Sequence, residues 1–193
     1  TRAPNEIRDL RGVLDQMRLT KDAHEIDTMR QAADIASAGH VRAMRACRPG
    51  MAEYELEAEL AYEFRRRGAD GHAYTPIVAG GANACILHYV DNNKLLAGHS
   101  LVLIDAGCEV GGYASDITRT FPVGGRFSPV QREVYEIVLA AQQAAIAAVR
   151  PGAAFTDYHL AALRVLTQGL IDLKVLTGSV DGAIESEAYK PWY

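Results

Sequence analysis

The sequence predicts a mixed α/β (α+β) domain that is internally duplicated. Segments with helical periodicity lie toward both ends of the chain, and strand-like segments lie between them, at about residues 73–123. The tripeptide Arg-Pro-Gly occurs at residues 48–50 and again at 150–152, each time between two predicted helices. A repeated helix–turn–helix unit predicts two-fold pseudosymmetry. The alternative is a chance match, because Arg-Pro-Gly is also a simple signal for a turn between helices.

Composition sets broad limits on the class of protein. The length of 193 residues suits one domain, and 49% hydrophobic and 23% charged residues are ordinary globular values. A net charge of −4 gives no reason to expect a nucleic acid or an anionic membrane as partner, and no segment is apolar enough to span a bilayer. The three cysteines form no CxxC pair, which favours reduced thiols in a cytoplasmic protein.

The first half of the predicted domain begins with two helices. Residues 1–18 are expected to be a linker or lead-in helix, followed by a domain over 19–193. Thr20 is the predicted N-cap of a helix from Lys21 to about Cys47, which Pro49 and Gly50 end. The face of this helix that we expect to be buried comprises Ile26, Met29, Ala33, Ala36 and Val41.

The second predicted helix runs from Glu53 to Arg67, with Gly68 after it. Its apolar stripe consists of Leu56, Leu60 and Phe64. Strand-like segments follow at residues 73–90, 101–107 and 117–123. The first αβ half then ends at about residue 125.

The start of a second half is predicted at about residues 126–193. Ser128 and Pro129 open a helix that runs to Val149. Aligning the two Arg-Pro-Gly segments with a two-residue insertion pairs Tyr54 with Tyr158, Leu56 with Leu160, and Ala58 with Ala162. Only 24 residues follow Gly169, so we expect the sheet of the second half to be largely missing and the chain to be part of something longer.

Asp105 and Asp116 lie on either side of the Gly111-Gly112 pair, within "LVLIDAGCEVGGYASDITRTFPV" at 101–123. A hairpin with its loop at Val110-Gly111 would place the two aspartates directly opposite each other. A loop at Gly111-Gly112 would place them diagonally, still on one face of the sheet. Either register brings the two carboxylates to roughly 5–8 Å from each other.

Two carboxylates so close together repel each other unless a cation lies between them. Their oxygen atoms suit Mn²⁺, Mg²⁺ or Ca²⁺, whereas zinc or cobalt usually also takes nitrogen ligands. The structural alternative is that Asp105 ends a strand by accepting backbone hydrogen bonds while Asp116 pairs with Arg119. The apolar run before Asp105, the double glycine and the Thr118-Arg119 pair favour the metal site.

Three segments, "ILHY", "LVLIDAGCEVGGYASDITRTFPV" and "FSPVQREVYEIVL", resemble the catalytic domain of the Xaa-Pro aminopeptidase (aminopeptidase P) group of family M24 metallopeptidases. The resemblance extends from about residue 17 onward. It implies the pita-bread (creatinase/aminopeptidase) fold, internally duplicated, with an incomplete second half in this chain. It also implies two divalent cations held by two aspartates, one histidine and two glutamates. Mn²⁺ is the expected ion, with Zn²⁺ or Co²⁺ as alternatives, and the sites could be empty in so short a chain.

The resemblance assigns roles to five residues. Asp105 matches the aspartate that binds one metal ion, and Asp116 matches the aspartate that bridges both. His88 matches a histidine that contacts the substrate and assists proton movement, and Tyr74 matches an active-site tyrosine. Thr118 is expected to lie beside a ligand carboxylate.

The activity implied is hydrolysis of the bond between an N-terminal residue and a following proline, by a homo-oligomer. An Xaa-Pro dipeptidase (prolidase) and an inactive pita-bread fragment or binding module are the alternatives; a metal-free creatinase-like hydrolase would not need both aspartates. No counterpart of the ligand histidine or glutamates occurs after residue 123; Glu185 and Glu187 lie in "GAIESEAYKPWY", which resembles the segment just before the family's ligand-bearing motif. We expect the 193 residues alone to be inactive. The alternative is that the segment with the missing ligands is present as a separate chain and completes the site.

Overall fold

A computed structural model describes residues 8–192. The chain divides into two compact units, residues 1–126 and 127–193, and each is described here by itself. Of the predicted lead-in segment 1–18, residues 1–7 lie outside the described residues. The remainder carries helix α1 (Arg11–Leu19), none of whose residues is buried.

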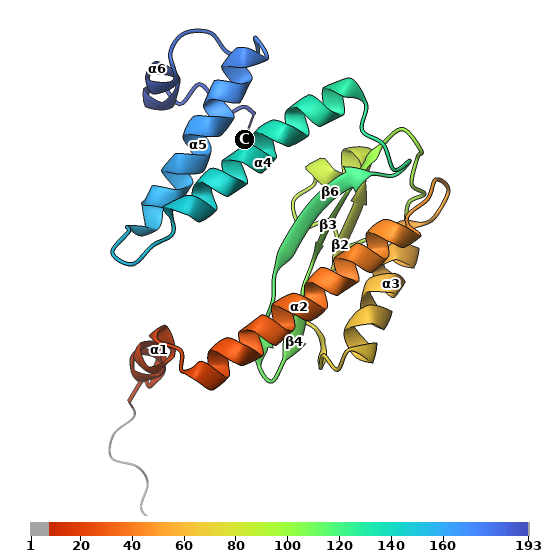
Figure 1. The fold of residues 1–193 in the computed structure, drawn as a ribbon, viewed down its shortest axis with the longest axis vertical. Helices are drawn as coiled ribbons and strands as arrows, with labels where there is room; N and C mark the ends of the chain where they lie inside the picture. The colour runs from red at the N-terminus through yellow and green to blue at the C-terminus, as the bar shows by residue number, and fades with distance from the viewer. Residues whose placement is uncertain (1–7, 193) are drawn as a thin grey trace, which may run out of the picture. The chain divides into compact units, whose positions relative to one another are not determined.

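The first unit packs two helices against two small antiparallel sheets (Figure 1). The helices are α2 (Ala23–Ala46) and α3 (Glu53–Arg66). One sheet has the order β1-β4-β5 and the other β2-β3-β6. The elements are β1 (Gly71–His72), β2 (Ile77–Gly80), the 3₁₀ helix η1 (Gly81–Cys85), β3 (Leu101–Ala106), β4 (Cys108–Val110), β5 (Tyr113–Ala114) and β6 (Ile117–Pro122).

The apolar stripe predicted on α3 is confirmed. Leu56, Leu60 and Phe64 are each 0% exposed and form the centre of the core, together with the buried side of β3. On β3 the residues alternate, so that Val102, Ile104 and Ala106 face this core while the residues between them face the other side of the sheet. The other side of the sheet carries Asp105.

The buried face of α2 differs from the predicted one. Of the predicted residues only Ala36 is buried, whereas Ile26, Met29 and Val41 are exposed. Small residues let α2 approach its neighbours closely: a Cβ on Gly39 would lie 2.4 Å from Phe64 Cε1. The face that is buried consists of Ala32, Ile35, Ala36, Gly39, His40 and Ala43.

The start of α2 also differs, because Asp22 rather than Thr20 caps it. The Asp22 carboxylate accepts a hydrogen bond from the Glu25 amide at 2.9 Å, and the Glu25 carboxylate accepts one from the Asp22 amide at 2.7 Å. This reciprocal capping box satisfies donors at the helix start that Thr20, two residues earlier and extended, does not reach.

The predicted strand at 73–90 is wrong over its second part. β2 ends at Gly80, and Gly81 has φ = 57°, a conformation that turns the chain out of the sheet and into η1. Ile86 and Leu87, which suggested a strand, are exposed after η1. Apolar character was therefore a misleading signal at these positions.

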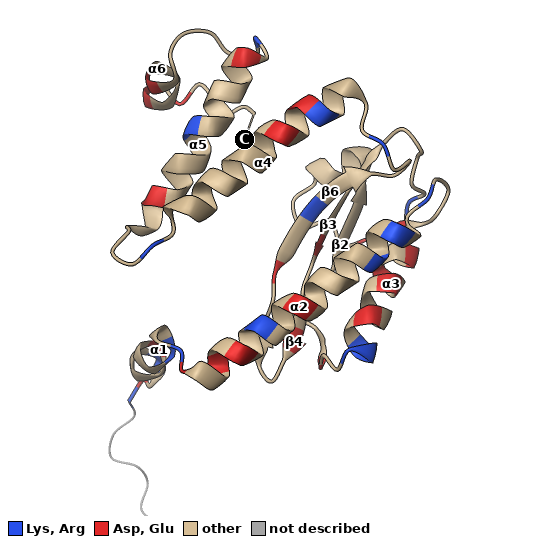
Figure 2. Cartoon of the chain, viewed as in Figure 1, with Lys and Arg blue, Asp and Glu red and all other residues tan. Residues whose placement is uncertain are grey.

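The solvent face of α2 and α3 carries interleaved charges of both signs (Figure 2). Glu63 on α3 is buried, and its carboxylate is contacted by Arg66 at 2.8 Å and Arg67 at 2.5 Å. These arginines hold the pKa of Glu63 down at about 2, against the opposing effect of burial. Arg42 from α2 lies over the Tyr62 ring, 4.4 Å from its centroid.

The second unit consists of α4 (Pro129–Ala148), α5 (Phe155–Asp172) and α6 (Val180–Glu185). Ser128 caps α4 as predicted, with its side chain accepting from the Gln131 amide at 3.2 Å. α5 packs closely on α4 at Gly169, where a Cβ would lie 2.4 Å from Ile137 Cγ2. None of the helices in the described part of the chain is long and apolar enough to cross a membrane.

The two Arg-Pro-Gly turns match without the predicted insertion. α3 begins at Glu53 and α5 at Phe155, so each helix starts at the same distance from its turn. The insertion also paired Leu56, which is fully buried, with Leu160, which is 47% exposed. That alignment of the two helices is therefore wrong.

Candidate metal centre

A single hairpin crosses from one sheet to the other, and the two aspartates lie at the crossing. Its arms form β3 and β6 in one sheet, and β4 and β5 in the other. At the crossing, a Cβ on Gly107 would lie 1.7 Å from the Ser115 carbonyl oxygen. Only glycine allows the two backbones to come so close. Asp105 precedes this contact in one arm, and Asp116 follows it in the other.

The Ser115 side chain fixes the crossing on the second arm. Its hydroxyl accepts a hydrogen bond from the Cys108 amide and donates one to the Cys108 carbonyl, both at 3.0 Å. Ser115 is 7% exposed, so this pair of bonds is shielded from water. The residue directly after it, Asp116, is thereby held in a defined direction.

The hairpin turns at Gly111-Gly112, with φ values of 54° and 82° that favour glycine in a two-residue loop. The register that follows pairs Asp105 with Thr118 rather than with Asp116. The two aspartates are therefore diagonal neighbours on one face of the hairpin. The directly opposed arrangement, with the loop at Val110-Gly111, is wrong.

Tyr74 joins the two carboxylates. Its hydroxyl lies 2.5 Å from Asp105 Oδ1 and 3.0 Å from Asp116 Oδ1, and donates toward both. Tyr74 reaches this place because the residue before it, Ala73, donates its amide to the Gly107 carbonyl at 3.0 Å. This bond holds the connection between β1 and β2 next to the crossing. Burial, and then the hydrogen bond to Asp105, raise the pKa of the Tyr74 phenol.

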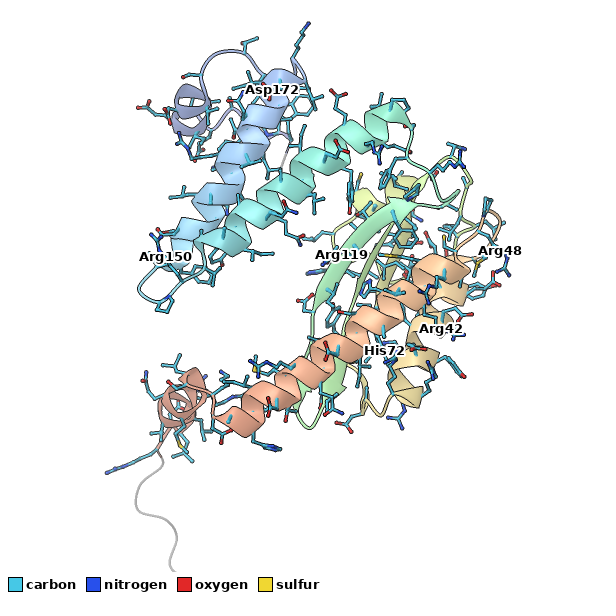
Figure 3. All side chains as sticks on the ribbon, in the orientation of Figure 1. Arg42, Arg48, His72, Arg119, Arg150 and Asp172 are labelled. Carbon is cyan, nitrogen blue, oxygen red and sulfur yellow. The ribbon has the colours of Figure 1, made fainter. Side chains whose placement is uncertain are left out.

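The structural alternative for the aspartates is not realised in the described residues. Arg119, labelled on β6 in Figure 3, donates from its guanidinium Nη1 to the Thr118 carbonyl at 2.7 Å and makes no described ion pair with Asp116. Asp105 accepts no hydrogen bond from a described backbone amide; its described partner is Tyr74. Both carboxylates thus point to a shared hydroxyl.

The other two predicted site residues, Thr118 and His88, are connected to the aspartates less closely than Tyr74 is. Thr118 lies opposite Asp105 on the same face of the sheet, with no described hydrogen bond from its side chain. His88 is exposed, follows η1 and has φ = 54°. No described hydrogen bond joins its imidazole to Tyr74, Asp105 or Asp116.

His40, which the sequence did not single out, supports the strand that carries Asp105. Its ring lies under β3, 3% exposed, with Nε2 3.1 Å from the Ala106 carbonyl oxygen. Burial lowers the pKa of this imidazole, so the neutral form with its proton on Nε2 suits the contact. The signal that could have identified His40 was its position in the buried face of α2. His40 was missed because the sequence predicted a different face of this helix to be buried.

The oxygen atoms of Asp105, Asp116 and Tyr74 fit part of a site for a hard cation. Two carboxylates and a phenol offer only oxygen, which is the chemistry that Mn²⁺ or Mg²⁺ prefers. Within residues 8–192, no cluster of three or more His, Cys, Asp or Glu side chains could hold a metal ion. Among the described residues, the site therefore offers two carboxylates and no complete coordination shell.

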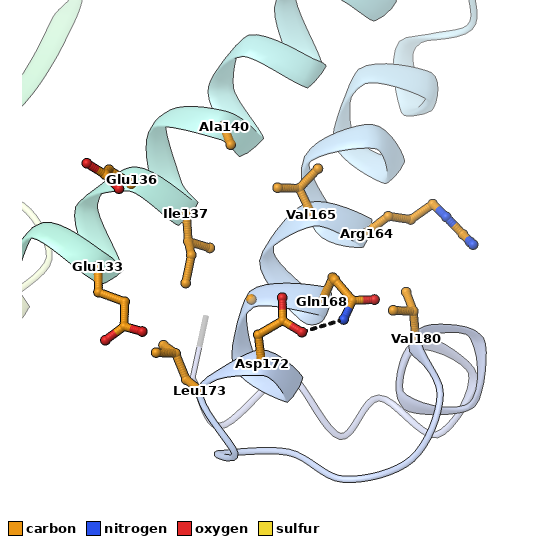
Figure 4. Close-up of a pocket in the computed structure, with 11 residues that line it drawn as sticks. Glu133, Glu136, Ile137, Ala140, Arg164, Val165, Gln168, Asp172, Leu173 and Val180 are labelled. Atoms are coloured by element: carbon orange, nitrogen blue, oxygen red, sulfur yellow. Dashed lines mark hydrogen bonds between the residues drawn. The ribbon is translucent and has the colours of Figure 1, made fainter. Parts of the chain in front are cut away.

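A separate hollow of about 650 Å³ lies within the second unit, between α4, α5 and α6 (Figure 4). It is lined by apolar side chains such as Ile137 and by Glu133, Glu136 and Asp172, the last bonded to Gln168 at 2.8 Å. None of the predicted site residues lines it.

Comparison with known proteins gives one consistent result. The sequence profile of metallopeptidase family M24 matches residues 27–188. Xaa-Pro aminopeptidase from Haemophilus influenzae is 50% identical over 189 residues, which cover 98% of this chain and 44% of that protein. The chain thus spans less than half the length of the curated relatives it matches.

Solved structures agree. Aminopeptidase PepP from Pseudomonas aeruginosa has a TM-score of 0.95 at 52% identity, over 98% of this chain and 43% of that one. A variant of Escherichia coli aminopeptidase P in complex with substrate has a TM-score of 0.94 at 46% identity, over 98% and 43% of the two chains. The pita-bread fold predicted from the sequence is confirmed, and the chain belongs to metallopeptidase family M24.

Proposed function

We propose that this chain is part of a metal-dependent aminopeptidase that releases an N-terminal residue preceding proline. The Haemophilus influenzae relative, 50% identical over nearly the whole chain, is an Xaa-Pro aminopeptidase. The two solved relatives, 52% and 46% identical, are aminopeptidase PepP and aminopeptidase P. The substrate is then a peptide with proline at the second position. These names favour this activity over a dipeptidase or an inactive binding module.

The observation that carries the proposal is the convergence of Asp105, Asp116 and Tyr74. Asp105 and Asp116 would hold two divalent cations, with Asp116 shared between them and Mn²⁺ as the expected ion. Such ions lower the pKa of water and polarise a scissile carbonyl. The Escherichia coli relative has been solved in a zinc-substituted form in complex with product, which supports Zn²⁺ as an alternative.

The remaining site residues, Tyr74, Thr118 and His88, orient the carboxylates or hold and release protons. The Tyr74 hydroxyl orients both carboxylates, because it is within 3.0 Å of an oxygen of each. Thr118 lies beside Asp105 and can hydrogen-bond a carboxylate oxygen that Tyr74 leaves free. His88, exposed on its segment, would contact the substrate and hold or release a proton at its imidazole.

We also propose that these 193 residues alone do not turn over peptide, because the described residues hold only two carboxylate ligands at the site. The histidine and two glutamates expected from the family would come from a further segment, in the same chain or in another. Homo-oligomer formation and a cytoplasmic location are part of the proposal. Three free cysteines support the location, because unpaired thiols suit a reducing compartment.

The test compares two aspartate variants in the complete protein. Asp116→Asn removes a ligand charge, and we expect turnover of an Xaa-Pro-Xaa tripeptide with Mn²⁺ to fall more than about 100-fold. Asp34→Asn, at an exposed position on α2, is the matched control and should retain activity. Retained activity in Asp116→Asn would contradict the metal role. Preference for an Xaa-Pro dipeptide over the tripeptide would instead indicate the dipeptidase.

A further inference from the structure

Glu53 is a fully buried carboxylate that the proposed mechanism does not use. It is the first residue of α3, is 0% exposed, and has no described ion pair with a lysine or arginine. A buried charge without a counter-ion is costly to retain. A glutamine or an apolar side chain of similar size would avoid that cost, so the carboxylate calls for an explanation.

The Glu53 carboxylate accepts four hydrogen bonds. Oε1 accepts from the Gly80 amide at 2.8 Å and from Asn83 Nδ2 at 2.9 Å. Oε2 accepts from the Tyr89 hydroxyl at 2.8 Å and from the Lys94 amide at 3.0 Å. Burial opposes ionisation, yet these donors outweigh it and lower the pKa of Glu53, so the group is charged at neutral pH.

All four donors belong to one stretch of chain. They lie at the two ends and in the interior of residues 80–94, which we call the His88 segment. A second anchor is Asn92, 2% exposed, whose side chain accepts from the Val78 amide at 2.9 Å and donates to the Pro76 carbonyl at 2.9 Å. After Gly80, the last residue of β2, no residue of the segment lies in a described strand, so side chains take the place of a sheet ladder in holding it.

His88 is the residue that this arrangement displays. Its neighbour Tyr89 is 7% exposed and bonded to Glu53, whereas Leu87 on its other side is 86% exposed. His88 itself has φ = 54°, which a residue with a side chain adopts only where its surroundings impose it. The anchor that fixes Tyr89 therefore also fixes the backbone from which the imidazole projects.

We propose that Glu53 is a positioning residue for His88. It acts through Tyr89, Asn83 and the two backbone amides, and it touches neither substrate nor metal. Only an ionised carboxylate can accept from all four donors, since an amide in its place would turn an N–H toward at least one of them. The role of His88 in this inference rests on the proposed function. The anchoring of the His88 segment by Glu53 does not.

The first experiment measures amide hydrogen exchange in this chain for the wild type, Glu53→Gln and Glu63→Gln. Glu63 is the matched control, because it is also a buried carboxylate on α3 but contacts arginines and not the His88 segment. We expect Glu53→Gln to raise exchange over residues 80–94 by roughly tenfold. The control should leave that segment unchanged, whatever it does to overall stability.

Two results would overturn the inference: unchanged exchange over 80–94 in Glu53→Gln, or an equal rise in Glu63→Gln. If Glu53→Gln does not fold, the Tyr89→Phe variant tests the inference instead, because it removes one hydrogen-bond donor to Glu53 and keeps the aromatic ring. It should raise exchange in the same segment by a smaller factor. No rise in Tyr89→Phe would then count against the inference.

The second experiment separates positioning from general support, in the complete enzyme. We expect Glu53→Gln to lower kcat for an Xaa-Pro-Xaa peptide about tenfold or more, and to have no further effect when His88→Ala is already present. A full additive loss in the double variant would overturn the positioning role. If the wild-type enzyme does not cleave such peptides, the proposed function fails while the exchange result stands.

Discussion

In both helix pairs, α2–α3 and α4–α5, an Arg-Pro-Gly turn leads into a helix whose N-cap is an alanine. Ala52 donates its amide to the Glu55 carboxylate at 2.7 Å, and Ala154 donates its amide to the Asp157 carboxylate at 2.9 Å. The glycines of the two turns also have nearly the same φ, 86° and 84°. The local sequence therefore gives the same turn and the same cap in both units.

The packing of the two pairs is different. In the first, Leu56, Leu60 and Phe64 are each 0% exposed beneath a sheet. In the second, α4 buries only Ala141 among its residues, and Val130 and Ile146 are 70% and 65% exposed. The comparison teaches that caps and turns are local properties, whereas the depth of burial depends on the elements that a helix packs against.

The largest expected effect tests this difference in burial. Phe64→Ala should lower the free energy of unfolding by about 3–5 kcal/mol, because it leaves a cavity in the core of the first unit. Leu166→Ala, at the matching position of α5 and only half-buried, should cost about 1–2 kcal/mol. Urea unfolding followed by circular dichroism measures both. Equal losses would mean that the two pairs are equally well packed.

A smaller effect is expected at the glycines that close each pair. A Cβ at Gly39 or at Gly169 would lie 2.4 Å from an atom of the facing helix, Phe64 in one case and Ile137 in the other. Gly39→Ala should cost about 1–3 kcal/mol, because Phe64 is fully buried and cannot move. Gly169→Ala should cost less, because Ile137 is half-buried and has more room to shift than Phe64, while the gain of about 1 kcal/mol in helix propensity is the same at both positions. Thermal unfolding of the two variants tests this order.

The first pair should also be selectively sensitive to acid. The pKa of Glu63 is about 2 in the folded protein, lowered from an ordinary value of 4.5 by Arg66 and Arg67. A lowered pKa stabilises the fold fully above pH 4.5, and that stabilisation is lost as the pH falls toward 2. Because the arginines are half-exposed, we expect a modest effect, smaller than the core changes.

Glu63→Gln is the variant that checks this. Its unfolding free energy should fall less steeply between pH 4.5 and pH 2 than that of the wild type, over the window set by the two pKa values. Urea unfolding at a series of pH values gives the slopes. Parallel slopes in the two proteins would show that Glu63 does not contribute to the acid sensitivity.

The smallest effect is expected where the two pairs are alike. Glu55→Ala and Asp157→Ala each remove one capping hydrogen bond, and each should cost about 1 kcal/mol. Nearly equal costs would show that the two caps are energetically as well as geometrically equivalent. A difference of more than about 1 kcal/mol would show that packing also acts on the caps.

Much of the fold could be predicted because its signals are local. Ser128 and Pro129 marked the start of α4, and the spacing of Leu56, Leu60 and Phe64 marked the buried side of α3. The start and the buried face of α2 could not be predicted in the same way. Asp22 competes with Thr20 as cap, and close packing against Phe64 selects small residues over Ile26 and Met29.

The candidate site was predictable to the extent that one hairpin builds it. The glycine pair at 111–112 sets a register that brings Asp105 and Asp116 to one face, and period-two alternation is enough to see this. The contact with Tyr74 and the support from His40 come from other elements. Such contacts depend on how β1, β2 and α2 pack, which no spacing within one segment encodes.

Variation at positions 105 and 107 is limited by two unrelated requirements. Asp105 is required by the proposed chemistry, whereas Gly107 is required by space, because any Cβ there would meet the Ser115 backbone oxygen at 1.7 Å. A library randomised at both positions and selected only for folding should return glycine at 107 and a mixture of residues at 105. Selection for peptide cleavage should then narrow position 105 as well, so that the two requirements within Asp-Ala-Gly are separated.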